Sequence, residues 1–310
     1  MKSPILFVIF ALLSFFSLSA QNKPITVATD GSGDFRSIQE AIFSVRDYRP
    51  EGRTMIFIKK GVYREKIVCP SWKTNISLIG EDRDSTLITY NDHAKINNMG
   101  TFRSYTLKAE GVGFEMENLT VINDAPQVAQ AVALHVEADR SVFRNCRFLG
   151  FQDTVFNGNE NSRQYFEVCY IEGTVDFIFG PATVWLEGCE IRAKRNSYIT
   201  AASTPAHKPY GYVFNHCRLT ADPGVDAVYL GRPWRAYSAV IFMNCELGAH
   251  IRPAGWDNWR NPDNEKSVRY YEYNNTGAGS KRSGRVGWCR TLTKREAKKI
   301  KQEIVLGYTL

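Results

Sequence analysis

The sequence of 310 residues lacks the short motifs that identify several common catalytic classes. It contains no G-x-S-x-G segment, which excludes the nucleophile elbow of α/β serine hydrolases. It contains neither a Walker A loop nor the glycine pattern of a dinucleotide-binding site. Its five histidines form no H-x-x-x-H pair or similar metal-binding pattern. Any catalysis must therefore depend on other polar side chains.

Long apolar runs are absent after the N-terminus. Residues 1–20 read MKSPILFVIFALLSFFSLSA, with Lys2 before an apolar run that ends in small residues. This pattern is typical of a secretory signal peptide cleaved near Ala20. We therefore expect one mature domain over residues 21–310, secreted or periplasmic, with no stable membrane association. A retained membrane anchor is the alternative interpretation of the apolar segment.

Acidic residues are slightly fewer than basic ones: the sequence has 32 Asp and Glu and 39 Lys and Arg, which gives a net charge of +7. In an exported protein this excess favours an acidic polymer, such as a polyuronide or a sulfated glycan, over nucleic acid as the partner. The same charge is equally compatible with a simple contribution to solubility.

Cysteine is present at seven positions, and five of them mark an internal repeat. Each copy has an apolar residue, two further residues, Cys, one residue, an apolar residue, one residue, and then Gly or Ala. The copies are 143-FRNCRFLG-150, 166-FEVCYIEG-173, 186-LEGCEIRA-193, 214-FNHCRLTA-221 and 242-FMNCELGA-249. Successive cysteines are 23, 20, 28 and 28 residues apart, and Leu119 occupies the cysteine position of an earlier copy.

A repeat of twenty-odd residues indicates a solenoid. Apolar residues alternate within each copy, as in a strand with one buried face, and few windows between residues 50 and 290 have helical periodicity. The sequence therefore predicts an all-β parallel β-helix, in which the cysteines form an inward ladder of small apolar side chains. Free thiols are the preferred interpretation, and a disulfide between neighbouring coils is the alternative.

Two helices are expected at the ends of the solenoid. Residues 34–45 have one apolar face, with Asp34 as the expected N-cap. Such a helix would cover the unpaired strand edges of the first coil. Near the C-terminus, Thr293 and Glu296 form a capping-box pattern before a short Lys-rich helix.

The repeat also places two carboxylates together. Asp153 and Asp176 each lie seven residues after a ladder cysteine, and Gln130 lies another 23 residues before Asp153. Equivalent positions on successive coils stack about 4.8 Å apart, so Asp153 should lie beside Asp176, with Gln130 one coil further. Asp176 lies in 172-EGTVDFIFG-180, which has the composition of a buried strand.

Two adjacent carboxyl groups do not ionise independently, so one stays charged while the pKa of the other rises. This pairing suits a reaction that needs one carboxylate and one carboxylic acid. The alternatives are that both residues merely end turns or that they bind a cation.

Further polar side chains could complete a site. The amides of Gln130 and Gln152 can donate hydrogen bonds to an oxyanion, although a structural amide ladder is the alternative. In 229-YLGRPWRAY-237, Arg232 can bind a carboxylate through two hydrogen bonds. Trp234 can stack on a sugar ring, and core filling is its alternative role.

Several segments, in this order, resemble the pectinesterase family, the pectin methylesterases that are right-handed parallel β-helix carbohydrate esterases. The segments are 29-TDGSGDFRSIQEAI-42, 61-GVYRE-65, 130-QAVAL-134, 152-QDTV-155, 176-DFIFG-180, 230-LGRPW-234 and 285-RVGW-288. They cover nearly all of residues 21–310. Val155 departs from the family, which often has Leu there. The long N-terminal inhibitor-like region of many plant members is also missing.

The resemblance implies hydrolysis of the C6 methyl esters of galacturonate units in methyl-esterified homogalacturonan (pectin). It implies Asp176 as nucleophile, Asp153 as general acid and base, and Gln130 and Gln152 as oxyanion donors. Arg232 would orient Asp176.

Three more residues are implied in substrate binding: Trp234, which would stack on a galacturonate ring, Phe179 and Thr101. The family resemblance further implies no cofactor and no metal, and we expect a monomer that binds no nucleic acid.

Two kinds of rival remain open on the sequence alone. A pectate lyase or a polygalacturonase would use the same fold on the same polymer, but the sequence around Asp153 and Asp176 has no crowded acidic cluster for Ca²⁺. A non-catalytic glycan-binding or adhesin β-helix would keep the coils and Trp234. It would not need both aspartates together with Gln130, Gln152 and Arg232.

Overall fold

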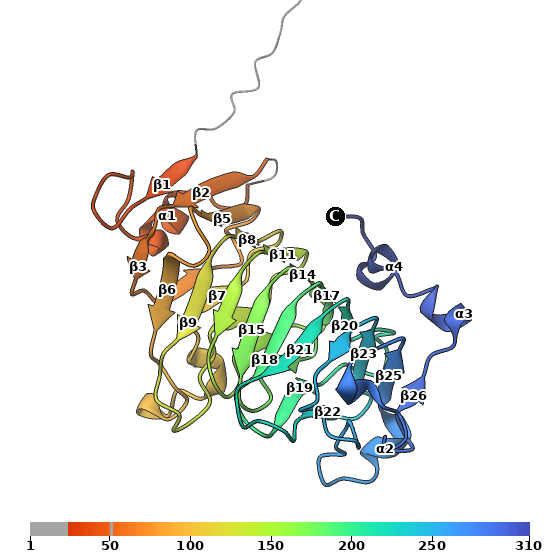
Figure 1. The fold of residues 1–310 in the computed structure, drawn as a ribbon. Helices are drawn as coiled ribbons and strands as arrows, with labels where there is room; N and C mark the ends of the chain where they lie inside the picture. Colours follow the sequence, from red (N-terminus) through yellow and green to blue (C-terminus); the bar gives the residue numbers. More distant parts are fainter. Residues whose placement is uncertain (1–23, 50–51) are drawn as a thin grey trace, which may run out of the picture.

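The fold is a stack of coils, each built from short parallel strands. The computed structural model describes residues 24–49 and 52–310, so the expected signal peptide lies outside the described residues. Within these ranges the strands form three sheets in which neighbours run parallel. Figure 1 shows the coils following one another from the red N-terminal end to the blue C-terminal end. The predicted parallel β-helix is confirmed.

The strands of the described residues stack along the solenoid in three sheets. In spatial order, sheet A contains β1 (Ile25–Val27), β2 (Thr54–Ile58), β5 (Ile76–Gly80), β8 (Glu115–Glu117), β11 (Ser141–Arg144), β14 (Arg163–Glu167), β17 (Thr183–Glu187), β20 (Tyr212–Asn215), β23 (Ala239–Met243), β25 (Arg269–Tyr273) and β26 (Arg290–Thr291). Sheet B contains β24 (Glu246–Leu247), β21 (Arg218–Ala221), β18 (Glu190–Ala193), β15 (Tyr170–Gly173), β12 (Arg147–Leu149), β9 (Thr120–Asn123), β6 (Thr86–Tyr90) and β3 (Gly61–Tyr63). Sheet C contains β22 (Tyr229–Pro233), β19 (Tyr198–Ala202), β16 (Ile178–Gly180), β13 (Val155–Asn157), β10 (Leu134–Val136), β7 (Leu107–Ala109) and β4 (Ile67–Cys69).

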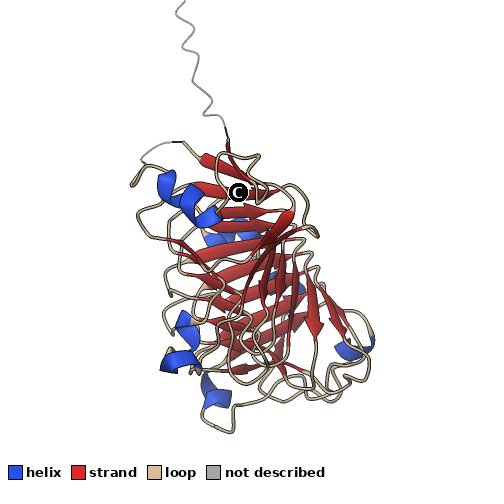
Figure 2. Ribbon diagram, turned by 90° about the vertical axis from the view of Figure 1, so that its left-hand side faces the viewer, coloured by secondary structure: helices blue, strands red, loops and turns tan. Residues whose placement is uncertain are grey.

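Helices are short and lie at the periphery of the stacked strands (Figure 2). The α-helices of the described residues are α1 (Ile38–Ser44), α2 (Asn264–Ser267), α3 (Lys294–Ala297) and α4 (Gln302–Leu306). Single 3-10 turns are η1 (Ile96–Asn98), η2 (Thr101–Arg103) and η3 (Ala278–Ser280). In residues 24–49 and 52–310, no helix has the length and apolar character needed to cross a membrane.

The cysteine ladder lies inside the solenoid as predicted. Its five members are buried and none forms a disulfide: Cys146, Cys169, Cys189, Cys217 and Cys245. The pairing of Thr120 with Arg147 brings Leu119 beside Cys146, which confirms the predicted earlier copy. Thiol groups donate weakly to carbonyls of the preceding coil, as from Cys169 Sγ to Phe143 O at 3.4 Å. Packing and backbone pairing therefore hold the coils in register without covalent links.

The residue before each ladder position has a left-handed backbone. The φ angle is 55° at Asn118, 47° at Asn145 and 55° at Asn244, and Asn tolerates this conformation well. The side chains of Asn145 and Asn118 also hydrogen-bond to each other at 2.7 Å. Val168 has the same conformation, with φ of 53°. A β-branched side chain is unfavourable there, so this turn carries local strain.

The predicted N-terminal helix is present, but its predicted start was wrong. The N-cap is Ser37, whose Oγ accepts a hydrogen bond from Glu40 N. Asp34 instead accepts hydrogen bonds from Thr26 N and Oγ1 at 2.8 and 2.7 Å. Glu65 of the next coil binds the first helical N–H groups, at Ile38 and Gln39. A tertiary contact that the local pattern does not reveal therefore fixes the helix start.

The C-terminal segment covers the outer face of sheet A. The predicted capping box of Thr293 and Glu296 begins α3. Apolar residues of this segment, including Ile300 and Leu306, pack with Tyr165 and Trp185 of the sheet. Arg163 Nη1 donates to Leu306 O at 3.1 Å, so the chain end returns to the middle of the solenoid.

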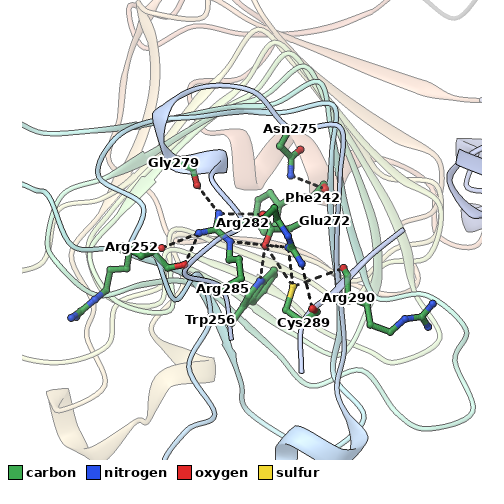
Figure 3. A network of polar contacts seen from close by, with 11 residues as sticks. Phe242, Arg252, Trp256, Glu272, Asn275, Gly279, Arg282, Arg285, Cys289 and Arg290 are labelled. Carbon is green, nitrogen blue, oxygen red and sulfur yellow. Dashed lines mark hydrogen bonds and ion pairs between the residues drawn. The ribbon is translucent and has the colours of Figure 1, made fainter. Parts of the chain in front are cut away.

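A buried charge cluster closes the C-terminal end of the core (Figure 3). Glu272 is only 2% exposed. Its carboxylate accepts from Arg285 Nε at 2.8 Å, Arg282 Nη1 at 2.7 Å and Trp256 Nε1 at 3.2 Å. The segment that contains 285-RVGW-288 is therefore bound to strand β25 through the carboxylate of Glu272, whose charge the two arginines compensate.

Replacing Val168 by Asn should stabilise the protein by about 1 kcal/mol, because a left-handed backbone costs most L-residues about 1–2 kcal/mol. The midpoint of urea unfolding measures this change. The matched control is Asn145→Val, which should destabilise by at least the same amount. A Val168→Asn protein no more stable than the parent would contradict the inferred strain.

Glu272→Ala should destabilise by about 3–5 kcal/mol, because it leaves Arg285, whose side chain is 3% exposed, buried without its counter-ion. Arg282→Ala is the control, since Arg282 is 34% exposed and Arg285 would still neutralise Glu272. We expect it to cost about 1 kcal/mol or less. Equal losses in denaturant unfolding would show that the cluster does not depend on the buried carboxylate.

Candidate active site

The predicted site residues all line one cavity of about 240 Å³ on the outer side of sheet C. These residues are Thr101, Gln130, Gln152, Asp153, Asp176, Phe179, Arg232 and Trp234. Phe102, Ala201 and Trp259 also line the cavity and were not predicted from the sequence. Residues as far apart in sequence as Thr101 and Trp259 thus meet at one place.

The two aspartates lie in turns between sheets B and C, so the prediction of a strand around Asp176 was wrong. Their φ angles are 65° at Asp153 and 50° at Asp176. Asp tolerates this left-handed conformation better than most residues. The inter-coil hydrogen bonds continue through both turns, from Asp153 N to Val175 O at 3.0 Å and from Asp176 N to Tyr198 O at 2.9 Å. A turn in register can therefore place a side chain as firmly as a strand.

The predicted stacking of the aspartates agrees with the strand register. Val155 pairs with Ile178, so Asp153 and Asp176, each two residues earlier, occupy equivalent positions on adjacent coils. Adjacent coils are about 4.8 Å apart. The structure therefore places these two carboxyl groups in one small, buried region.

The equal spacing predicted for Gln130 was wrong. Ala131 N donates to Gln152 O at 3.1 Å, which pairs Ala131 with Asp153 in the same way that the bond from Asp153 N to Val175 O pairs Asp153 with Asp176. Gln130 therefore lies one residue before the position equivalent to Asp153. The loop between β9 and β10 is longer than the turn between β12 and β13, so the spacing between these coils differs from the 23 residues that separate Asp153 from Asp176. Gln130 O accepts from Ala94 N at 2.8 Å, which fixes the loop. Within residues 24–49 and 52–310, the side-chain amides of Gln130 and Gln152 have no hydrogen-bond partner.

The aspartates have different electrostatic environments. Asp153 is 9% exposed and Asp176 is 6% exposed. Arg232 donates to both carboxylate oxygens of Asp176, from Nε at 3.0 Å and from Nη2 at 2.7 Å. Such bidentate contact with a guanidinium strongly favours the ionised carboxylate.

The pKa values of both aspartates are shifted upward, but not equally. Burial raises the pKa of Asp176, and the hydrogen bonds and charge of Arg232 oppose the rise. Burial and then the negative charge of Asp176 raise the pKa of Asp153 well above its ordinary value, with only partial opposition from Arg232. Asp176 is therefore the group that ionises first, and Asp153 the one that keeps its proton.

Arg232 reaches Asp176 across an intervening coil. In sheet C, Phe179 pairs with Ala201, and Ala201 pairs with Arg232. The guanidinium packs on two aromatic rings, with its carbon 3.9 Å from the centroid of Tyr198 and 3.7 Å from that of Trp259. Counting along the sequence does not reach Tyr198, because the spacing of 20 residues between Cys169 and Cys189 leads from Asp176 to Asn196. Trp259 lies in a loop between β24 and α2, where no repeat predicts its position.

Three aromatic side chains that line the cavity, Phe102, Phe179 and Trp234, belong to a cluster that also contains Phe156. Phe156 and Phe179 lie on adjacent coils with ring centroids 4.8 Å apart. Phe102 packs on Phe156 at 4.8 Å, and its ring lies 6.4 Å from Trp234. Apolar ring faces beside buried carboxyl groups suit a flat, polar ligand such as a sugar.

A larger cavity of about 500 Å³ opens over Val168 and Gly188, away from the aspartates. Its arginines are paired with acids, as in Arg147 with Asp84 at 3.0 Å and Arg218 with Glu190 at 2.8 Å. This charge compensation leaves no free reactive group of the kind found at Asp153. In the described part of the chain, no cluster of three or more His, Cys, Asp or Glu side chains could hold a metal ion.

Chemically, the smaller cavity combines a carboxyl group bound by an arginine, a second carboxyl group with a strongly raised pKa, and two side-chain amides. A carboxylate can attack a carbonyl carbon, a carboxylic acid can protonate a leaving group, and amides can stabilise an oxyanion. These three functions together suit acyl transfer from an ester.

Comparisons with known proteins agree with this chemistry. The sequence model of the family described as Pectinesterase matches residues 24–307. Pectinesterase 31 of Arabidopsis thaliana is 41% identical over 292 residues, which are 90% of this chain and 90% of that protein. Probable pectinesterase/pectinesterase inhibitor 6 of Arabidopsis thaliana is 40% identical over 293 residues, 90% of this chain but 52% of that longer protein.

Among solved structures, pectin methylesterase from carrot matches with a TM-score of 0.88 and 36% identity, over 93% of this chain and 95% of that one. The family match, the sequence identity and the common fold show that the chain belongs to the pectinesterase family of carboxylic ester hydrolases.

Proposed function

We propose that the protein hydrolyses the C6 methyl esters of galacturonate units in pectin, releasing methanol and leaving a free carboxylate on the polymer. The observation that carries the proposal is the buried pair of Asp153 and Asp176, of which only Asp176 is bound by Arg232. The names of the pectinesterase and pectin methylesterase relatives support the choice of substrate.

In the proposed mechanism, the Asp176 carboxylate attacks the ester carbonyl carbon. The negative charge that develops on the carbonyl oxygen is stabilised by the amide groups of Gln130 and Gln152, which line the same cavity. As the tetrahedral intermediate collapses, the C–O bond to the methoxy group breaks, and Asp153 transfers its proton to that oxygen. Methanol leaves and an anhydride joins Asp176 to the substrate.

Water completes the cycle. Asp153, now a carboxylate, removes a proton from water, which attacks the anhydride. The Asp176 carboxylate is released, and Asp153 again holds a proton. The new carboxylic acid of the substrate loses its own proton to solvent and becomes a carboxylate. Arg232 keeps Asp176 ionised and oriented for the first step. We further propose that Trp234 stacks on a sugar ring and that Phe179 and Thr101 contact the substrate.

The protein's location and organisation follow from the same proposal. A pectin-active enzyme must reach its polymer outside the cytoplasm, which supports export by the signal peptide at residues 1–20. We propose residues 21–310 as a single mature catalytic domain acting as a monomer.

Asp176→Asn should abolish methanol release from methylated pectin, because an amide is not a competent nucleophile. Asp153→Asn should lower kcat about 10²- to 10⁴-fold, the usual contribution of a general acid or base. Both are measured in the presence of EDTA. Asp263→Asn, at an aspartate whose side chain is 81% exposed, is the control and should match the parent. Retained activity in Asp176→Asn would show that the nucleophile is misassigned.

The same assay separates rival activities on this polymer. Unsaturated, ultraviolet-absorbing ends that disappear with EDTA would indicate a lyase, and new reducing ends would indicate a polygalacturonase. Either result without methanol release would overturn the proposed function.

The activity should have a bell-shaped pH dependence, with kcat/KM falling below the pKa of Asp176 and above the pKa of Asp153. The pKa of Asp153 is raised in the folded protein. The contribution of this carboxyl group to folding stability is therefore fully present below its unfolded pKa, and it is lost as the pH rises through its folded pKa. Asp153→Asn removes that loss. The variant should therefore melt at a higher temperature than the parent at pH 8, but not at pH 4. A lower melting temperature at pH 8 would contradict the assignment of Asp153 as a destabilised acid.

A further inference from the structure

We propose that Tyr198, Trp259 and Ala201 act as positioning residues that hold Arg232 on Asp176, an inference that rests on the proposed function for its catalytic meaning. Neither ring needs to contact the reacting atoms for this role. The two rings restrict the guanidinium from its two faces, and the small Ala201 leaves the path along which the arginine side chain reaches its partner.

The path over Ala201 follows from the register of sheet C. Phe156, Phe179, Ala201 and Arg232 occupy equivalent positions on four successive coils. The first two carry large rings on the outer face, whereas Ala201 carries only a methyl group. Arg232 lies two coils from the level of Asp176, about 10 Å at the usual strand spacing, so its side chain must extend past position 201.

Tyr198 provides one face of the clamp. It lies on the coil after Asp176, and its carbonyl accepts the Asp176 N–H at 2.9 Å. Its ring stacks on Tyr229 of the next coil, with centroids 5.3 Å apart and planes at 11°. Because this stacking fixes the ring, Tyr198 presents a rigid surface to Arg232, whose guanidinium carbon lies 3.9 Å from the ring centroid.

Trp259 provides the opposite face from a strained loop. Its φ angle is 61° and that of Arg260 is 54°, which is unusual for large side chains. Asp257 Oδ1 accepts the Trp259 N–H at 2.7 Å, and Asn258 Nδ2 donates to Glu265 at 2.7 Å. Unfavourable backbone conformations persist where the surroundings hold them, often at functional sites. Here the strain places an indole ring 3.7 Å from the Arg232 guanidinium carbon.

The clamp predicts a specific electrostatic effect. Arg232 lowers the pKa of Asp176 and of Asp153, against the larger effect of burial. A looser Arg232 would oppose burial less, so both carboxyl groups would lose their protons at higher pH. A residue that only stabilises the fold would change the amount of active enzyme but not the pH at which these groups titrate.

The test uses Tyr198→Ala, because Tyr198 is not among the described residues that line the cavity. Its kcat should fall roughly 2- to 30-fold, the range expected for one cation–π contact, with KM changed less than twofold. Both limbs of the pH profile should move to higher pH. Tyr198→Phe keeps the ring face and should restore kcat and both limbs.

Ala201→Leu provides an independent variant, because it obstructs the arginine's path without altering either ring. It should shift the limbs in the same direction, with an additional rise in KM because Ala201 lines the cavity. Trp259→Ala should also shift them, with an additional rise in KM because Trp259 lines the cavity. The matched control is Tyr170→Ala, which removes a comparable Tyr–Arg contact at 5.3 Å from Arg147 on another face. Its limbs should stay at the parental pH.

The pH at which Asp176 titrates, followed by ¹³C NMR of labelled carboxyl groups, gives a readout that does not require turnover. A higher Asp176 pKa in Tyr198→Ala than in the parent would support the clamp even if the parent released no methanol, in which case only the proposed function would fail. Unchanged titration in Tyr198→Ala and Ala201→Leu, or an equal shift in Tyr170→Ala, would overturn the clamp.

Discussion

The hydrogen-bonded register between adjacent coils is the constraint on which the site depends. The pairing of β13 with β16 brings Asp153 and Asp176 to equivalent turns, and backbone bonds from both aspartate N–H groups extend that register to the reactive residues. The backbones of the two aspartates cannot separate without breaking these hydrogen bonds. Their proximity is therefore a property of the solenoid, and the turns require only a residue that accepts a left-handed backbone.

Proximity and burial make this part of the molecule electrostatically costly. Two desolvated carboxyl groups raise each other's affinity for protons, and the protein compensates only one of them directly, through Arg232. The buried Glu272 at the C-terminal end is a useful contrast, because two arginines and an indole N–H satisfy it. Glu272 is a charge with a structural role, and its hydrogen-bond donors compensate it fully. Among the residues that the structure describes, Asp153 has no such partner, and its pKa is raised, which is the property that the proposed mechanism requires of a general acid.

Most of this arrangement could be predicted from the sequence, because the repeat allows equivalent positions on successive coils to be found by counting residues. The cysteine spacing predicted the solenoid, and the interval of 23 residues predicted the aspartate pair. The same counting failed at Gln130, because strand pairing does not fix the length of the loops between coils. Composition suggested a strand at Asp176, but the backbone turns there while keeping its hydrogen bonds. Trp259 and the Ser37 N-cap depend on contacts between distant segments, which local patterns do not contain.

The sandwich around Arg232 has a consequence for an enzyme whose product is an anion. Each turnover on pectin would convert a neutral ester into a carboxylate beside the site, and that new charge would compete with Asp176 for the nearest guanidinium. With Tyr198 and Trp259 against its two faces, Arg232 can exchange partners only in its own plane, where Asp176 already occupies two donors. The aromatic pair would thereby protect the counter-ion of the proposed nucleophile from capture by an increasingly acidic polymer, and so limit inhibition as demethylation proceeds.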